Sequence, residues 1–283
     1  MAETTSTVKP TTSVQAKKSS NIISLLAPVL CLVAGYAIWR WGLGNPSNFK
    51  VAGGGWFWPD REGPLSPLSK MYLGGIIVPV LIGTFLTMAT FVIERFMTIS
   101  RANGTGNNAD FVRKVQYQLA NKNVDAALAE CDKQKGSVGN VMKAGLHRYK
   151  EMISNTDLST EQKVIAIQKE VEEATSLELP MLEKNLVFLS TIASLATLIG
   201  LLGTVVGMIR AFAGLGADSG GAASAAQLSI GISEALYNTA LGIGTSAFAI
   251  MFYNIFTTKI DGITYGIDES GFTLTQTFAS LYK

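Results

Sequence analysis

The sequence predicts an all-α, multi-pass membrane protein with about four transmembrane helices and a cytoplasmic helical domain. Hydrophobic residues make up 48% of the 283 residues and charged residues only 16%, a composition too apolar for an ordinary soluble domain. Several apolar runs reach the ~20 residues that a helix needs to cross a bilayer. A long polar stretch between two of these runs carries too much charge to lie in lipid. One portion of the chain is therefore expected outside the membrane.

The N-terminal part predicts a tail followed by a helix. Residues 1–20 are rich in Thr, Ser and Lys, and we expect a disordered cytoplasmic tail because they hold little apolar surface to bury. Residues 21–41 predict an extra N-terminal transmembrane helix, which ends at Trp39 and Trp41 in an interfacial belt. A cleaved signal peptide is the alternative. The long apolar run without an A-x-A cleavage pattern favours a retained helix.

Residues 42–70 are rich in Gly, Pro and Trp, which interrupt regular structure, and they predict an external loop with its aromatic side chains at the lipid headgroups. No Lys-Ser/Thr pair follows the glycines, so a phosphate-binding loop is excluded. Residues 71–95 predict the next transmembrane helix, in which neighbouring helices can tolerate Pro79. Glu94 and Arg95 end this span.

Residues 96–185 are polar and predict the cytoplasmic helical domain. Ser159 and Gln162 form a capping box before a long helix, which we expect to continue past Pro180 into the membrane as one rod. His147 is the only histidine and has no cluster of ligands around it, so neither a metal site nor a catalytic residue is predicted. Cys31 lies in an apolar segment and Cys131 in the polar one, so we expect no disulfide.

Two apolar helices, at residues 186–213 and 229–257, carry the most informative pattern. Projected at 100° per residue, each gathers small and polar residues on one face and bulky apolar residues on the other. Small residues at such spacing favour close helix packing. The packing candidates are Gly200, Gly203, Gly207 and Gly242, and the candidates for an ion pathway or pore lining on the same faces are Thr197, Thr204, Glu234, Asn238 and Thr239.

Glu234 is the carboxylate inside this apolar region. A charged residue within a membrane is costly unless it faces protein or water. Two interpretations stay open. The carboxylate takes part in ion passage, or it forms a hydrogen bond to a neighbouring subunit and fixes the packing.

The distribution of basic residues predicts the orientation. Lys and Arg are concentrated in residues 95–184 and absent from 211–258. By the positive-inside rule, the polar domain is cytoplasmic and residues 214–228 form an external loop. Both termini, including a C-terminal tail at 258–283, are then cytoplasmic.

Residues 200–208 (GLLGTVVGM) and 231–242 (GISEALYNTALG) resemble the last two membrane helices of the MotA/TolQ/ExbB proton channel family, and more its ExbB and TolQ branch. The likeness covers roughly residues 71–257. Phe248 stands where the family usually has a proline, and the N-terminal helix is additional. The resemblance implies a homo-oligomeric channel, a pentamer, in which Thr204 and Thr239 line the pore.

The same resemblance implies a proton-driven motor of the bacterial inner membrane. An ExbD/TolR-like single-span partner would place an aspartate between the threonines, and a TonB-like protein would transmit the work to outer-membrane transport. Membrane lipids are the remaining partner. No enzyme activity, no nucleic acid and no cofactor beyond the proton motive force are implied. A non-conducting scaffold that holds a partner helix and a TolQ-type role in cell-envelope maintenance are the alternatives.

Overall fold

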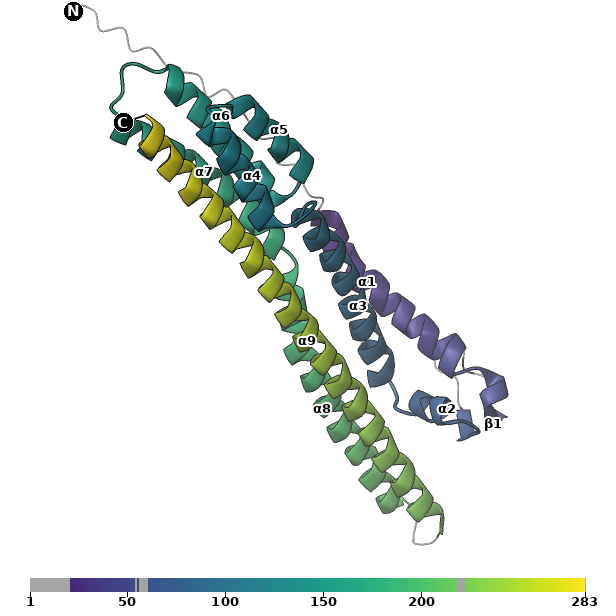
Figure 1. Cartoon of the computed structure of the whole chain (residues 1–283). Helices are drawn as coiled ribbons and strands as arrows, with labels where there is room; N and C mark the ends of the chain where they lie inside the picture. Colours follow the sequence, from purple (N-terminus) through teal and green to yellow (C-terminus); the bar gives the residue numbers. More distant parts are fainter. Residues whose placement is uncertain (1–20, 54, 56–60, 218–221, 283) are drawn as a thin grey trace, which may run out of the picture.

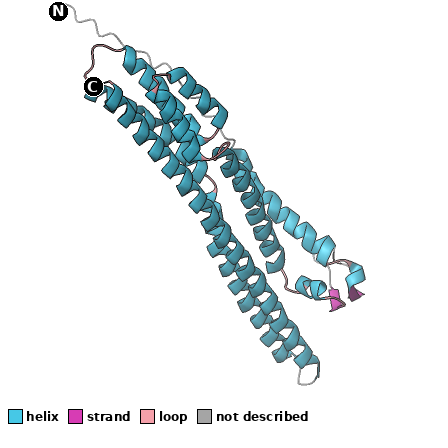
Figure 2. Cartoon of the chain, viewed as in Figure 1, coloured by secondary structure: helices cyan, strands magenta, loops and turns pink. Residues whose placement is uncertain are grey.

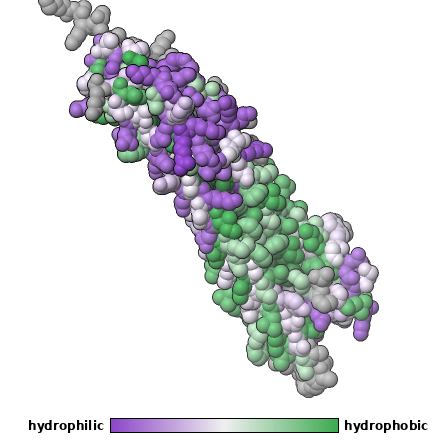
Figure 3. Space-filling model, viewed as in Figure 1, coloured by the Kyte–Doolittle hydropathy of each residue, from purple (hydrophilic) through white to green (hydrophobic). Residues whose placement is uncertain are grey.

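The computed structural model describes residues 21–53, 55, 61–217 and 222–282. The predicted disordered tail at 1–20 and the aromatic residues 56–58 lie outside these residues. Within the described residues, four helical segments are long and apolar enough to cross a membrane, which confirms the predicted all-α, multi-pass fold. Apolar residues cover one half of the visible face and polar residues the other (Figure 3).

Two long antiparallel helices form the axis of the molecule (Figure 1). They are α8 (Leu186–Ala217) and α9 (Ala222–Leu281). The helix that contains the predicted span 229–257 continues without a break through Phe248 to Leu281. Residues 258–281 are thus helical, and they bury one face among the helices of the polar domain. That face consists of Ile260, Ile263, Ile267, Leu274 and Phe278.

The polar domain packs against one face of the C-terminal half of α9. Three of its four helices start at a polar side-chain cap, as Asn123 shows by accepting a hydrogen bond from the Ala126 amide. Tyr149 packs edge-on against Phe278 of α9, with ring centroids 4.8 Å apart. The four helices are α4 (Asn108–Ala120), α5 (Val124–Gln134), α6 (Ser137–Ser154) and α7 (Thr160–Glu183).

The other apolar helices, α1 (Asn21–Ala37) and α3 (Ile77–Ala102), pack side by side, and α3 also packs against α8 and α9. The backbones of α1 and α3 approach closely at Gly35. A Cβ added to this residue would lie only 2.6 Å from the Gly83 nitrogen. Apolar side chains of α1 that point away from α3 are exposed, among them Leu25 and Val29. These exposed side chains suit lipid.

The predicted external loop contains regular structure (Figure 2). Trp39 was expected at the membrane interface with Trp41. Instead it is fully buried, while Trp41 is 69% exposed. The Trp39 ring stacks on Tyr72, and its indole N–H donates to the Tyr72 carbonyl at 3.2 Å. The elements here are η1 (Ile38–Leu43), η2 (Pro46–Asn48), the antiparallel strands β1 (Phe49–Ala52) and β2 (Arg61–Pro64), and α2 (Pro67–Tyr72).

The predicted rod from the polar domain into the membrane is wrong. The predicted capping box at Ser159 starts α7, and Pro180 lies inside this helix, but α7 ends at Glu183. Asn185 has a φ of 68°, so the chain turns before α8 begins. Proline removes one helical N–H, and asparagine tolerates the left-handed conformation better than most residues. The two effects act within one and a half turns of each other and separate α7 from α8.

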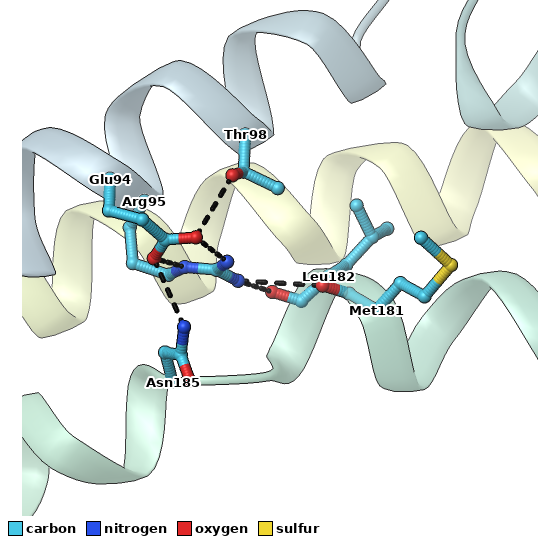
Figure 4. Close-up of polar contacts among 6 residues, drawn as sticks. All are labelled: Glu94, Arg95, Thr98, Met181, Leu182 and Asn185. Carbon is cyan, nitrogen blue, oxygen red and sulfur yellow. Dashed lines mark hydrogen bonds and ion pairs between the residues drawn. The ribbon is translucent and has the colours of Figure 1, made fainter. Parts of the chain in front are cut away.

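Two charged residues of α3, Glu94 and Arg95, form hydrogen bonds with the residues at the break between α7 and α8 (Figure 4). The Arg95 guanidinium donates to the Leu182 carbonyl at 3.0 Å, one of the acceptors left open where α7 ends. Glu94 accepts from the Arg95 Nε at 2.6 Å and from the Asn185 side chain at 3.3 Å. Thr98 donates to the same carboxylate at 3.2 Å. The two charged residues therefore do more than end a membrane span, because they fix the turn between α7 and α8.

Candidate functional site

The small faces of α8 and α9 pack against each other within one chain. A Cβ on Gly203 would lie 2.4 Å from the Asn238 Cβ, and one on Gly242 would lie 2.6 Å from the Ala196 carbonyl oxygen. Gly200 and Gly207 likewise lie at this contact, against α9. The partner helix that the glycine pattern requires is thus the other arm of the same hairpin.

Thr204 and Thr239 meet across this contact, with their hydroxyl oxygens 2.7 Å apart. Each hydroxyl also lies within hydrogen-bond distance of a carbonyl of its own helix, Gly200 at 3.2 Å and Ala235 at 3.1 Å. Both side chains are only half-buried. On the α8 side, Thr204 lies at an apolar hollow of about 570 Å³ that Leu201, Val205, Met208, Ile209 and Phe212 also line. The hydroxyl pair is therefore the polar point of an otherwise apolar surface.

Asn238 lies beside the threonine pair and is 1% exposed. Its amide nitrogen donates to the Gly74 carbonyl at 3.2 Å, which ties α9 to the turn between α2 and α3. Its Oδ1 has no hydrogen-bond partner among the residues that the structure describes. Thr197 is not brought into this group: it is exposed, two turns from Thr204, and its hydroxyl lies 3.4 Å from the Ala193 carbonyl of its own helix.

Glu234 forms an ion pair with Arg210 of α8, at 2.6 Å between Oε1 and Nη1. The carboxylate is 5% exposed, whereas the Arg210 side chain is 49% exposed. Gly75 lies directly over the pair, since a Cβ there would be 2.4 Å from the Arg210 Nη1. Its φ of 70° also favours glycine. Three segments therefore meet at this ion pair, with the carboxylate buried and the guanidinium half exposed.

Arg210 is the site residue that the sequence analysis missed. Arg210 lies directly before the stretch 211–258, which contains no Lys or Arg, so the distribution of basic residues does not reveal it. The antiparallel alignment of α8 and α9 could have predicted that Arg210 lies next to Glu234. From the threonine pair, Arg210 lies six residues along α8 and Glu234 five residues back along α9, so both fall at one level of the hairpin.

The glycine contact yields a direct test on α9. We expect Gly242→Ala to destabilise the protein by about 1 to 3 kcal/mol, because the added methyl group meets backbone atoms that cannot move aside. Gly244→Ala is the matched control, since a Cβ at Gly244 meets no atom within 4 Å. Thermal unfolding of the two purified variants measures the difference. Equal melting temperatures would show that the helices are not closely packed at Gly242.

These features define a class: a multi-pass helical membrane protein whose two longest helices hold a hydroxyl pair and an ion pair between them. Residues 133–269, which include α6, α7, α8 and most of α9, match the model of the MotA/TolQ/ExbB proton channel family. This match confirms the predicted resemblance to the family over residues 133–269, a shorter range than the predicted 71–257. Members of the family are channel and transport proteins, not a class of enzymes.

Relatives come from both branches named above. ExbB-like biopolymer transport protein 3 of Synechocystis is 38% identical over 86 residues, which are 30% of this chain and 41% of that protein. Tol-Pal system protein TolQ of Pseudomonas aeruginosa is 27% identical over 193 residues, 62% of this chain and 83% of TolQ. TolQ of Haemophilus influenzae is 40% identical over 34% of this chain and 43% of its own length. The chain thus spans less than half of the first and third of these relatives.

Proposed function

We propose that this chain is the ExbB/TolQ-like subunit of a proton-driven motor in the bacterial inner membrane. The contact between Thr204 and Thr239 is the observation that carries the proposal. Their hydroxyls can donate and accept hydrogen bonds, and they lie together in a largely apolar wall. Such a pair can hold a water or a protonated carboxyl group at that depth.

A proton carrier has to come from a partner. Between Leu186 and Lys259, the described parts of α8 and α9 contain one carboxylate, Glu234, and Arg210 neutralises it. We therefore propose a single-span ExbD/TolR-like partner that brings an acid to the threonine pair. A homopentamer around this partner would supply five pairs. Each proton that crosses 100 mV releases ~2.3 kcal/mol, so a few protons suffice for mechanical work on a TonB-like protein.

The charge distribution supports the proposed topology. Lys and Arg crowd the polar domain of α4 to α7 and are absent from residues 211–258, so we place that domain and both termini in the cytoplasm. Residues 214–217 and 222–228 of the predicted loop belong to α8 and α9, and this end of the hairpin then faces the periplasm. Lipids would surround the exposed apolar faces.

The hydroxyl pair can be tested by conduction. Thr204→Val and Thr239→Val remove a hydroxyl at nearly constant volume, so we expect intact assembly and about tenfold lower proton flux. Flux is measured with a pH-sensitive dye in vesicles that hold the chain together with its partner. Thr191→Val is the control, because that threonine is exposed on α8 and donates to Val187 of its own helix. Wild-type flux in both pore variants would remove the threonines from the ion path.

A non-conducting scaffold that holds a partner helix remains the second candidate function. Asn238 and Glu234 connect three segments of the chain, and these contacts would stiffen a helix whose role is to hold a partner. In that case, wild-type vesicles would retain the partner yet conduct no protons. The ExbB-type and TolQ-type roles are separated by complementation. Rescue of outer-membrane uptake indicates the first, and rescue of detergent resistance the second.

A further inference from the structure

We infer that a cavity between α3 and α9 binds the phosphate group of an anionic phospholipid. The cavity has a volume of about 160 Å³. It is separate from the threonine pair and from the ion pair of Glu234, and the inference does not depend on proton conduction. Its lining includes Phe96 and Ser100 of α3, Asn103 directly after α3, and Phe256, Lys259 and Ile263 of α9.

The cavity lies where both helices change from apolar to polar. Lys259 is the first charged residue of α9 after Glu234, at the end of an uninterrupted uncharged run. On α3, Ile93 and Phe96 are 60% and 56% exposed, and the polar Ser100 follows one turn later. The polar and apolar halves of the visible face meet at the middle of the molecule (Figure 3). Lipid headgroups occupy this level of a membrane protein.

The polar groups at the cavity are donors that lack protein acceptors. The Lys259 ammonium lies 5.5 Å from the centre of the Phe96 ring, and no carboxylate among the described residues pairs with it. Ser100 and Asn103 are exposed, and neither side chain forms a hydrogen bond within the described part of the chain. No carboxylate of the described residues lines the cavity. One cation and two neutral donors around a small cavity match the acceptor oxygens of a phosphate.

The surrounding surface favours a lipid over a free phosphate ion. The exposed apolar side chains of Ile93 and Phe96 on α3 and of Ile255 on α9 lie on the membrane side of these donors. An acyl chain can cover such side chains when the headgroup is held by Lys259. A free phosphate ion would gain nothing from them.

The test uses the purified oligomer in detergent and native mass spectrometry. We titrate phosphatidylglycerol and, in separate arms, phosphatidylcholine and inorganic phosphate. We expect phosphatidylglycerol to bind the wild type best, and Lys259→Gln to weaken it about fivefold, the effect of one basic residue near an anionic lipid surface. Lys259→Arg should retain binding. Lys169→Gln is the charge-matched control, because Lys169 is 75% exposed on α7 and its carboxylate partner lies 3.8 Å away.

Ser100→Ala gives an independent check without a change of charge, and it should also reduce phosphatidylglycerol binding. Equal binding by the wild type and Lys259→Gln would overturn the inference, and so would equal affinity for phosphatidylcholine. Binding of inorganic phosphate as tight as that of phosphatidylglycerol would show a free-anion site instead of a lipid site, and would overturn it too.

Discussion

Replacing Arg95 by alanine is expected to lower the stability of the folded chain by about 3 kcal/mol. The Arg95 side chain is 3% exposed, and its loss leaves the Glu94 carboxylate without its cation. The Leu182 carbonyl at the end of α7 loses its donor as well. Broken buried ion pairs cost about 3 to 5 kcal/mol, and the low end applies here because the Glu94 side chain is 33% exposed and water can reach it.

Arg101→Ala is the matched control for this variant, since Arg101 lies on the same helix and is exposed. Thermal unfolding at one fixed scan rate ranks the variants. Arg95→Lys should fall between them, because an ammonium cannot reproduce the forked donors of a guanidinium. Limited trypsin digestion adds a local readout, as an opened α7–α8 turn exposes the bond after Lys184. If Arg95→Ala has the same melting temperature as Arg101→Ala and shows no new cleavage, the hydrogen bonds of Glu94 and Arg95 do not stabilise the turn between α7 and α8.

The break between α7 and α8 could not be predicted from the sequence, because it depends on contacts between residues far apart in the chain. Apolar length predicted the spans, because the cost of placing polar groups in lipid acts on each segment alone. Pro180 was equally compatible with a continuous helix, which it does enter. The left-handed Asn185 is held by Glu94, 91 residues away, and no local pattern contains that contact. Trp39 was misplaced for the same reason, since Tyr72 covers it from 33 residues further on.

The candidate site also contains residues that local spacing predicts and one contact that it does not. Helical periodicity placed the glycines and Thr204 on one face of α8, and Asn238 and Thr239 on one face of α9, so their positions follow from spacing alone. The cation beside Glu234 depends on how the two helices align. That alignment is readable from the sequence only once the helices are treated as an antiparallel hairpin and the glycine faces are set against each other.

The pair of Arg210 and Glu234 predicts an asymmetry between its two partners. Arg210→Gln leaves a carboxylate that is 5% exposed without its cation. We expect a loss of about 3 to 5 kcal/mol, the cost of an unpaired buried charge. Glu234→Gln leaves the Arg210 side chain, which is 49% exposed, free to turn toward water. An amide oxygen can still accept its hydrogen bond, so we expect a loss of only about 1 kcal/mol.

The double variant Arg210→Gln/Glu234→Gln should recover most of the stability lost in Arg210→Gln, because it no longer contains a buried charge. The measurements are the melting temperature, the amount of the proposed oligomer and the proposed proton flux of all three variants. A stable Glu234→Gln protein with normal flux would assign the carboxylate to packing, through its pairing with Arg210. A stable Glu234→Gln protein that has lost its flux would place the ionised carboxylate in the ion path. Equal damage from both single variants would contradict the asymmetry, since a half-exposed arginine should not cost as much to leave unpaired as a buried carboxylate.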